Sequence, residues 1–219
     1  MPQSNKRVVP GATVGRLPAY LQALTELSEA GSRRVASDEL ASVTGVRSAQ
    51  LRKDLSYLGT YGVRGVGYDV SQLIDEITAE LGLTQDWPVI IVGMGNMGRA
   101  LAAYGGFGQR GFRIVALADD DPSIVGDVVQ GLPVCRLADS LAANERLAIG
   151  VITTPADQAQ QIADRLVEHG VQSILNFAAI ALRVPDNVDV RRVDLSTELQ
   201  ILAFHAQRRD MAKGREGVG

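Results

Sequence analysis

The chain has 219 residues, of which 46% are hydrophobic and 21% are charged, so a soluble globular protein with room for two small domains is expected. Its net charge of −3 and isoelectric point near 5.4 argue against a basic coat that binds nucleic acid over the whole surface. Cys135 is the only cysteine, which excludes an intrachain disulfide and a thiol cluster for a metal, so no metal site is expected.

The amino-terminal residues include basic side chains, but no continuous apolar stretch follows them as it does in a secretory signal. No segment approaches the ~20 apolar residues that a membrane-spanning helix requires. The sequence therefore predicts a cytoplasmic protein without a membrane partner.

The first part of the chain has the periodicity of short helices. Apolar residues at spacings of three and four predict a helix that ends near Gly31: Leu17, Tyr20, Leu21, Leu24 and Leu27. A second helix is predicted to begin at Ser37, whose hydroxyl caps the amides that follow, and to stop at Gly45. A third is predicted from Arg47 or Ser48 to Leu58, with three leucines facing the core.

Glycines punctuate β-forming residues in "GTYGVRGVGYDV" (59–70), which is the composition of a hairpin. A fourth helix is predicted from Ser71 to Leu81. Three short helices and a glycine-rich hairpin predict a winged-helix DNA-binding domain over residues 1–82. "LTQDWP" (83–88) is interpreted as the linker, with Pro88 barring further helix.

Strands and helices alternate from residue 89 onward, which is typical of a doubly wound parallel sheet in an α/β fold. Strands are predicted at 89–94, 112–119, 148–154, 173–178 and 188–195, with helices after the first strand, at 157–170 and in the tail. Residues 120–147 are interpreted as a short excursion. The predicted Rossmann-like domain covers residues 83–195, and residues 196–219 form a carboxyl-terminal helix.

A glycine-rich motif follows the first of these strands and opens a helix, the context in which G-x-G-x-x-G indicates dinucleotide binding. Gly93 permits the tight turn, Gly95 lets the backbone approach a pyrophosphate, and Gly98 lets helix and strand pack closely. The cofactor-binding residues predicted from the motif itself are Gly93, Met94, Gly95, Asn96, Met97 and Gly98.

An acidic residue that binds ribose hydroxyls is expected about 20 positions further on. Asp119 lies at the end of the next predicted strand, and Asp120 and Asp121 follow it directly. A 2′-phosphate at this place would meet several like charges. The acids therefore favour NAD over NADP, with Asp119 and Asp121 as predicted ligands.

Catalysis by hydride transfer needs a proton donor or acceptor beside the reacting carbonyl. The segment 88–204 contains no lysine, and Tyr104 has no lysine four residues later. His169 is expected to interact with a helix dipole and His205 to pack in the tail. The sequence therefore predicts a binding protein and not an enzyme.

The third predicted helix turns a polar face away from its leucines. Glutamine, arginine, lysine and serine on this face suit the base edges of a DNA major groove, and the hairpin adds a tyrosine and an arginine. The predicted DNA-contacting residues are Arg47, Ser48, Ala49, Gln50, Arg52, Lys53, Ser56, Tyr61 and Arg64. A solvated face without a partner, or a face that binds protein, remains an alternative from periodicity alone.

The segment Ser48–Val70, followed by "IIVGMGNMGRALA" (90–102), resembles the Rex family of redox-sensing transcriptional repressors. The resemblance extends from about Arg16 to the tail helix. It implies a homodimer, without another protein partner, that binds pseudo-palindromic double-stranded operator DNA. It also implies NAD(H) as the sensed ligand, with release from DNA when NADH rises relative to NAD+.

The resemblance assigns further roles around the nucleotide. Tyr104 and the segment "LNFA", which contains Asn176 and Phe177, match positions near the nicotinamide, and two more cofactor positions match Thr153 and Pro155. Asp194 matches an acid that the family pairs with that tyrosine across subunits. Gln22 stands where some relatives have an arginine in this network, so that link is left open.

The tail helix has apolar residues on more than one side, which indicates burial on several sides. Leu199 and Leu202 lie on one side, and Ile201 and Phe204 on others. Family members insert this helix into the partner subunit, and Leu199, Leu202 and Phe204 are predicted interface residues with Tyr104 and Asp194. The alternative is a helix folded on its own sheet.

The predicted mechanism rests on charge, because NAD+ carries a positive nicotinamide that NADH lacks and a dry pocket disfavours an unpaired cation. NADH would then bind more tightly and favour a dimer whose recognition helices no longer match the operator. Two alternatives remain. One is a small NAD-dependent oxidoreductase with an amino-terminal dimerisation domain, and the other is a DNA-binding protein that binds coenzyme A.

Overall fold

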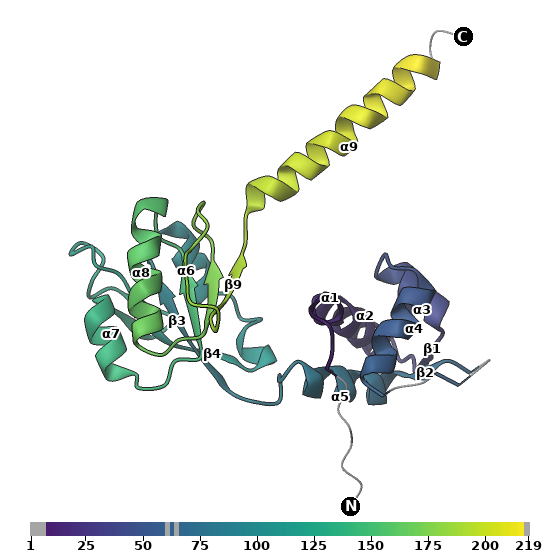
Figure 1. The fold of residues 1–219 in the computed structure, drawn as a ribbon, viewed down its shortest axis with the longest axis horizontal. Coiled ribbons are helices and arrows are strands. Elements are labelled where there is room, and N and C mark those ends of the chain that lie inside the picture. Colours follow the sequence, from purple (N-terminus) through teal and green to yellow (C-terminus); the bar gives the residue numbers. More distant parts are fainter. Residues whose placement is uncertain (1–7, 60–61, 64–65, 217–219) are drawn as a thin grey trace, which may run out of the picture. The chain divides into compact units, whose positions relative to one another are not determined.

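The computed structural model describes residues 8–59, 62–63 and 66–216, and their side chains as far as residue 209. The chain divides into two compact units, Met1–Gln85 and Asp86–Gly219, which are described separately (Figure 1). Within the described residues, no helix combines the length and the apolar composition that crossing a membrane requires.

The first unit is mainly helical. Its elements are α1 (Gly11–Val14), α2 (Leu17–Glu29), β1 (Arg34–Val35), α3 (Ser37–Val43), α4 (Ser48–Tyr57), β2 (Tyr68–Asp69) and α5 (Val70–Glu80). β1 and β2 pair antiparallel, and an isolated bridge joins Val63 to Gly67. The glycine-rich segment therefore ends in a strand that pairs with β1.

The predicted apolar stripe forms the core of this unit. Side chains from α2, α3, α4 and α5 are fully buried together, among them Leu17, Tyr20, Leu24, Leu40, Leu51, Leu55, Leu73 and Ile77. The predicted cap of the second helix is wrong: Ala36 occupies the cap position of α3, and no side chain caps it. The Ser37 hydroxyl instead accepts a hydrogen bond from Arg52 at 3.2 Å.

The second unit alternates strands and helices. Its elements are β3 (Trp87–Val92), α6 (Asn96–Ala102), the 3-10 helix η1 (Gly108–Arg110), β4 (Phe112–Ala118), β5 (Val128–Val129), β6 (Leu132–Cys135), α7 (Leu137–Ala143), β7 (Ile149–Ile152), α8 (Ala156–Glu168), β8 (Ser173–Asn176), β9 (Asp189–Arg192) and α9 (Leu195–Glu216). The prediction of an α/β chain with a helical amino-terminal region and a mainly parallel sheet is confirmed.

The sheet has the order β5-β6-β4-β3-β7-β8-β9, and every neighbouring pair is parallel except β5 with β6. β3 lies between β4 and β7, so the chain crosses to the other side of β3 after β6. Loops at the carboxyl ends of strands that flank such a switch point form ligand-binding crevices. The topology therefore brings the loops after β3, β4 and β7 together.

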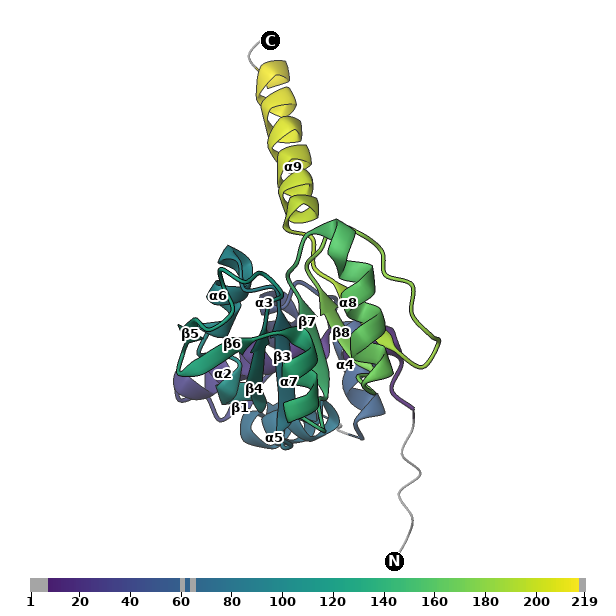
Figure 2. The same cartoon turned by 90° about the vertical axis from the view of Figure 1, so that its left-hand side faces the viewer.

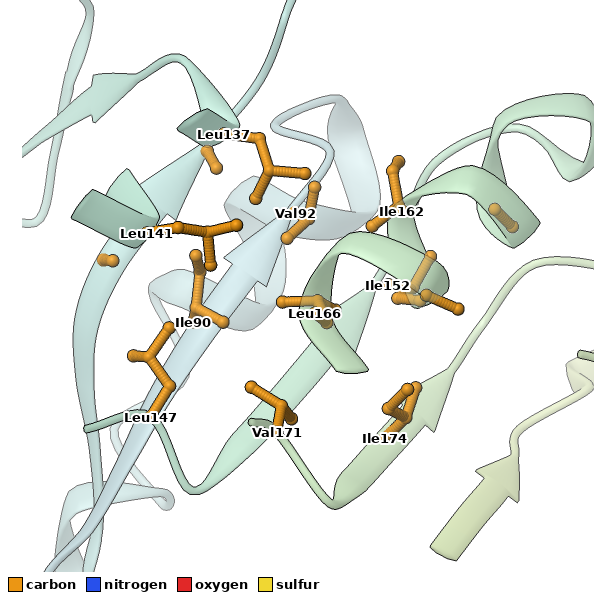
Figure 3. Packing of buried hydrophobic residues seen from close by; sticks show 14 of the residues in the cluster. Ile90, Val92, Leu137, Leu141, Leu147, Ile152, Ile162, Leu166, Val171 and Ile174 are labelled. Atoms are coloured by element: carbon orange, nitrogen blue, oxygen red, sulfur yellow. The ribbon is translucent and has the colours of Figure 1, made fainter. Parts of the chain in front are cut away.

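Helices cover both faces of the sheet. On one face, Ile90 and Val92 of β3 pack with Ile152 and with side chains of α7 and α8, as Figure 3 shows. Figure 2 shows α7 and α8 side by side on this face. On the other face, α6 packs against alternate residues of the same strands, including Val89, Ile91 and Val151. β3 is thus apolar on both faces, as a central parallel strand should be.

Two sequence interpretations need correction. Pro88 is not in a linker but is the second residue of β3, where its carbonyl accepts a hydrogen bond from Ala148 N at 2.9 Å. A proline is tolerated near the start of a strand because few ladder bonds are lost there. The excursion at 120–147 contains β5, β6 and α7, elements of two, four and seven residues that are too short to give a clear periodic signal.

Candidate functional site

The glycine motif forms a tight loop between β3 and α6. Gly93 has a φ of +100°, and a Cβ on it would lie 2.8 Å from Thr154 N, so both the conformation and the space require glycine. A Cβ on Gly98 would lie 2.0 Å from the Gly93 carbonyl oxygen. Nothing lies within 4 Å of the corresponding position on Gly95, which leaves the backbone open to a ligand.

Hydrogen bonds from neighbouring strands fix this loop. Gly93 N donates to the Ala118 carbonyl at 2.8 Å, and the Thr153 hydroxyl lies 2.7 Å from the Gly93 carbonyl oxygen, to which it donates. Thr153 therefore holds the glycine loop, and this role explains why a small hydroxyl residue follows β7.

Each of the three consecutive acids makes defined contacts. Asp119 accepts hydrogen bonds from Met94 N at 2.7 Å and from Asp121 N at 2.9 Å, so it joins the end of β4 to the glycine loop. Asp120 accepts from Leu137 N at 3.1 Å and pairs with Arg165. Asp121 accepts from the backbone and hydroxyl of Ser123, and these bonds lower the pKa of Asp121.

A cavity of about 590 Å³ lies at the switch point. Its lining comes from the glycine loop, the acids after β4, the loop after β7 and one face of α8: Gly93, Gly95, Asp119, Asp120, Asp121, Ile124, Thr153, Thr154, Pro155, Gln158, Gln161, Ile162 and Arg165. Six predicted cofactor residues line this cavity: Gly93, Gly95, Asp119, Asp121, Thr153 and Pro155. The volume and the bare glycine loop fit a dinucleotide.

Other predicted cofactor residues lie outside this cavity. Within the motif, Met94 is fully buried, Asn96 and Met97 lie exposed in the first turn of α6, and Gly98 is buried against the loop. Asn176 is also fully buried, and its amide bonds the backbone of Ala178 and Ile180, so it shapes the turn after β8.

The two aromatic residues assigned to the nicotinamide region are not brought to the acids. Tyr104 is 52% exposed and contacts Phe107 edge to face, with ring centroids 5.1 Å apart. Phe177 is partly buried against the α6 side of the sheet. Among the described residues of a single chain, no dry enclosure surrounds Tyr104.

Sequence reasoning missed the contribution of α8 to the cavity. Gln158, Gln161, Ile162 and Arg165 lie at spacings of three and four residues and face the acids from the neighbouring loop. This spacing is a helical face, so the signal was present. It was overlooked because polar residues on a helix are ordinarily solvated.

Exposure on α4 agrees in part with the predicted DNA-contacting face. Arg47, Ala49, Arg52 and Lys53 are exposed, while Ser48, Gln50 and Ser56 are partly buried. Tyr61 and Arg64 lie outside the described residues.

Intrachain bonds occupy three of the predicted base-contacting residues. Gln50 donates to Asp54 at 2.9 Å, Arg52 donates to Ser37, and the Ser56 hydroxyl donates to the Lys53 carbonyl at 2.7 Å. Lys53 is different: among the described contacts, its ammonium has no hydrogen bond or ion pair.

Asp54 is fully buried on the inner side of α4. Its carboxylate accepts from Thr13 (3.0 Å), from Arg16 Nε (2.7 Å) and Nη2 (2.8 Å), from Tyr20 (2.8 Å) and from Gln50. The network ties α4 to α1 and α2. Sequence reasoning counted Asp54 only as an acid among basic residues, although helical projection places it near Leu51 and Leu58 on the core side.

The network changes the acidity of its members. Burial alone raises the pKa of Asp54, but the hydrogen bonds from Arg16, Tyr20, Gln50 and Thr13 outweigh this effect and lower the pKa to about 2. Burial and the bond to Asp54 raise the pKa of Tyr20 to about 12. The bond to Asp54 also raises the pKa of Arg16. Asp54 and Arg16 are therefore charged, and Tyr20 neutral, at physiological pH.

The predicted interface residues other than Tyr104 lie at the end of the second unit. Asp194 accepts hydrogen bonds from Ser196 N at 3.0 Å and from Arg192 at 2.6 Å, and the bond from the Ser196 hydroxyl lowers the pKa of Asp194. It thereby stabilises the start of α9. Leu199, Leu202 and Phe204 are each more than half exposed on α9.

Two family models match the chain. One, described as "Putative DNA-binding protein N-terminus", matches residues 8–56 and includes most of α4. The other, described as "CoA binding domain", matches residues 84–180 and includes the glycine loop and the cavity.

Curated relatives cover nearly the whole chain. The redox-sensing transcriptional repressor Rex of Streptomyces avermitilis is 60% identical over 210 residues, which are 95% of this chain and 83% of that protein. The Rex of Streptomyces coelicolor is also 60% identical, over 95% of this chain and 81% of that protein. The Rex of Desulfitobacterium hafniense is 47% identical, over 92% and 97%.

Solved structures agree with these relatives. RSP, described as a Rex-family repressor, is 35% identical with a TM-score of 0.86, over 95% of this chain and 99% of that chain. RSP in complex with β-NADH has a TM-score of 0.85 at 35% identity, over 94% and 98%. RSP in complex with β-NAD+ and operator DNA has a TM-score of 0.85 at 36% identity, over 96% and 98%.

Proposed function

The chain belongs to the Rex family of redox-sensing transcriptional repressors, and we propose that it binds operator DNA through its first unit and NAD(H) through its second. It is a transcriptional repressor and not an enzyme. The observation that carries the proposal is the similarity, along both units, to RSP in complex with β-NAD+ and operator DNA.

The cavity at the switch point is the proposed nucleotide site. Gly95 leaves room for a pyrophosphate above the backbone, Asp119 lies where ribose hydroxyls would be bound, and Thr153 and Pro155 line the opposite side. When bound, the dinucleotide would carry one positive charge on its nicotinamide in the oxidised form and none there in the reduced form. Asp119 keeps acceptor capacity beyond its two backbone bonds, because a carboxylate accepts up to about four.

The first unit is proposed to be a winged helix with α4 as its recognition helix. Lys53 is exposed and has no described intrachain partner, so it is free to contact a base or a phosphate. Gln50 is held by Asp54 through its amide nitrogen, since a carboxylate accepts only. Its amide oxygen and its second N–H remain available to a base, so the bond to Asp54 orients the side chain without preventing a bidentate contact with adenine.

A homodimer completed by α9 is proposed for DNA binding and sensing. α9 exposes large apolar side chains, including Leu199 and Phe204, that water alone would cover in a monomer. The same unit has an open apolar cavity of about 320 Å³ on the α6 side of the sheet, with Val89, Phe112 and Leu175 in its lining. Insertion of the partner's α9 there would bury both surfaces and shield Tyr104 from water.

The proposed switch compares two dimer conformations. With the partner's α9 in place, Tyr104 and Phe177 would line an apolar environment that disfavours the cationic nicotinamide. The dimer form that holds the reduced nucleotide would then be populated when NADH rises, and in that form the two α4 helices would no longer match the operator half-sites. Repression would be relieved without any chemical conversion of the nucleotide.

Coenzyme A is the nearest competing ligand, because the matching family model bears its name. Coenzyme A lacks a free 2′/3′ diol on its adenosine, so it gains nothing from the Asp119 carboxylate. The variant Asp119→Ala is therefore expected to weaken NADH binding and to leave coenzyme A binding nearly unchanged.

The oxidoreductase alternative loses support at the residues that it requires. His169 Nε2 lies 2.8 Å from the Asn144 carbonyl oxygen, so the ring links two loops away from the cavity. Tyr104 has no lysine partner, and its hydroxyl lies outside the 590 Å³ cavity.

An operator gel shift with NADH, NAD+ and NADPH added in turn tests the proposed function. We expect NADH alone to release the DNA, while NAD+ and NADPH leave the complex intact at the same concentration. Release by all three nucleotides, or by none, or steady oxidation of NADH by the purified protein, would refute it.

A further inference from the structure

One basic side chain, that of Arg165, lines the proposed nucleotide cavity together with three acids. Arg165, from the last turns of α8, is the one basic residue among the described residues that line the cavity. It pairs with Asp120, and Asp119 and Asp121 line the same cavity. An arginine beside the ribose-binding acid is the group that accommodates the 2′-phosphate in NADP-binding members of this fold. Because Arg165 is present, the three acids alone do not exclude NADP from this cavity.

Asp120 engages this arginine. Arg165 Nη1 lies 3.2 Å from Asp120 Oδ2, and the side chains are 30% and 57% exposed, so a bound ligand can reach both. The other oxygen, Oδ1, accepts from Leu137 N at the start of α7 at 3.1 Å, which fixes the carboxylate in place. This second bond restrains the Asp120 carboxylate at the start of α7.

The pair has two consequences for an anion at this position. The Asp120 carboxylate pairs with the Arg165 charge, and one guanidinium N–H is occupied. Guanidinium groups bind phosphates by two parallel N–H donors, so occupation of one side reduces their value as a phosphate site. Asp119 and Asp121 then determine the net charge that a 2′-phosphate would meet.

We propose that Asp120 sets the selectivity of this site for NADH over NADPH by holding Arg165 in an ion pair, so that Arg165 is withheld from a 2′-phosphate. The inference rests on the proposed nucleotide function and adds the device that makes the site specific. Asp119 contributes by binding the ribose diol, whereas Asp120 acts as a positioning residue through Arg165.

The variant Asp120→Asn tests this arrangement directly. The asparagine oxygen retains the acceptor for Leu137 N, while the charge that holds Arg165 is removed. In the full-length protein, we expect NADPH to bind on the order of tenfold more tightly, the value of one charge-assisted hydrogen bond, in titrations of the purified dimer. NADH affinity should change by less than about threefold, because NADH offers no phosphate to the freed arginine.

Two further variants distinguish an effect through Arg165 from an effect of the net negative charge of the cavity. Asp121→Asn removes one negative charge from the same cavity without touching Arg165, and its retained oxygen still accepts from Ser123. We expect it to improve NADPH binding much less than Asp120→Asn does. Adding Arg165→Gln to Asp120→Asn should abolish the gain in NADPH affinity.

The outcomes are distinct. Equal gains in Asp120→Asn and Asp121→Asn, a gain that survives the loss of Arg165, or no gain at all would overturn the proposal while leaving NADH binding intact. Failure of the unaltered protein to bind NADH in the same titration would instead refute the proposed nucleotide function, and the selectivity device with it.

Discussion

At the scale of single residues, Asp54 has the largest expected effect, because one buried carboxylate joins α4 to α1 and α2. Asp54→Asn removes the charge that Arg16 and Tyr20 share and leaves one acceptor oxygen instead of two. We expect the free energy of unfolding to fall by about 2–4 kcal/mol, as when one partner of a buried pair is lost. Urea denaturation of the full chain followed by circular dichroism measures this change.

Glu29→Gln is the matched control, since Glu29 is exposed at the end of α2 and has no described side-chain partner. It should change stability by less than about 0.5 kcal/mol. If Asp54→Asn proved as stable as the control, the network would not be what holds α4.

The lowered pKa of Asp54 also predicts an acid dependence. Its stabilising contribution is complete above the ordinary pKa of 3.8 and is lost as the pH falls through the folded value of about 2. The shift corresponds to about 2 kcal/mol at neutral pH. The stability difference between the unaltered chain and Asp54→Asn should therefore shrink as the pH is lowered from ~5 to ~2 in the same denaturation experiment. A difference that stays constant over this range would contradict the prediction.

Individual residues were predictable to different degrees. The sequence predicts a shared site for the glycine motif and Asp119 because their spacing along the chain is fixed, and Gly93, Gly95 and Asp119 line one cavity. Apart from Gln50 on the same helix, the partners of Asp54 lie 34 to 41 positions away along the chain, at Thr13, Arg16 and Tyr20. Only the tertiary packing of α1 and α2 against α4 brings them together, so periodicity cannot identify them.

At the scale of elements, α4 exposes Lys53, whose ammonium has no hydrogen bond or ion pair among the described contacts. Because Lys53 has no intrachain partner among the described residues and Arg52 is partly engaged by Ser37 and Asp38, we expect Lys53→Gln to weaken operator binding ~10–100-fold and Arg52→Gln to weaken it less. The slope of log affinity against log salt should fall by about one if Lys53 contacts a phosphate, and sequence discrimination should relax if it contacts a base. Fluorescence anisotropy with operator and scrambled duplexes distinguishes the two contacts.

Arg183→Gln provides the control for this series, because it removes the same charge from an exposed position in the other unit. Operator affinity should be nearly unaffected there. NADH affinity should be unchanged in the two α4 variants, and an equal loss of operator binding in all three would show that only net charge matters.

The helix α9 carries the prediction about assembly. Leu199 and Leu202 are 66% and 61% exposed and lie three residues apart on one side of the helix. Placing two carboxylates there, in Leu199→Glu with Leu202→Glu, should prevent the proposed dimer from forming, since a charge buried without a partner is costly. Analytical ultracentrifugation should then detect a monomer, with operator affinity reduced by loss of the second half-site.

Gln207→Glu on the same helix should remain dimeric, and a dimeric double variant would mean that α9 does not form the interface.

Elements were predicted from the sequence where the apolar periodicity extends over several helical turns. α2, α5 and α8 begin and end within about two residues of their predicted limits. β5, β6 and α7 were missed because their short lengths leave no periodic pattern. The Ser37 cap was wrong because the hydroxyl serves Arg52 from α4, a contact that only the tertiary structure creates.

At the scale of the whole molecule, the two units must be linked energetically if the protein is a sensor. Binding of DNA and of NADH to different dimer forms requires that each ligand lower the affinity for the other by the same factor. A nearly complete change from the DNA-bound to the released form takes a differential affinity on the order of 10⁴. We expect the NADH affinity measured with saturating operator to be lower than the affinity measured without it. The factor should equal the one by which saturating NADH lowers the affinity for operator. NAD+ should be affected much less, and a scrambled duplex should leave NADH affinity unchanged. Equal NADH affinity with and without operator would leave two binding sites on one chain but no switch between them.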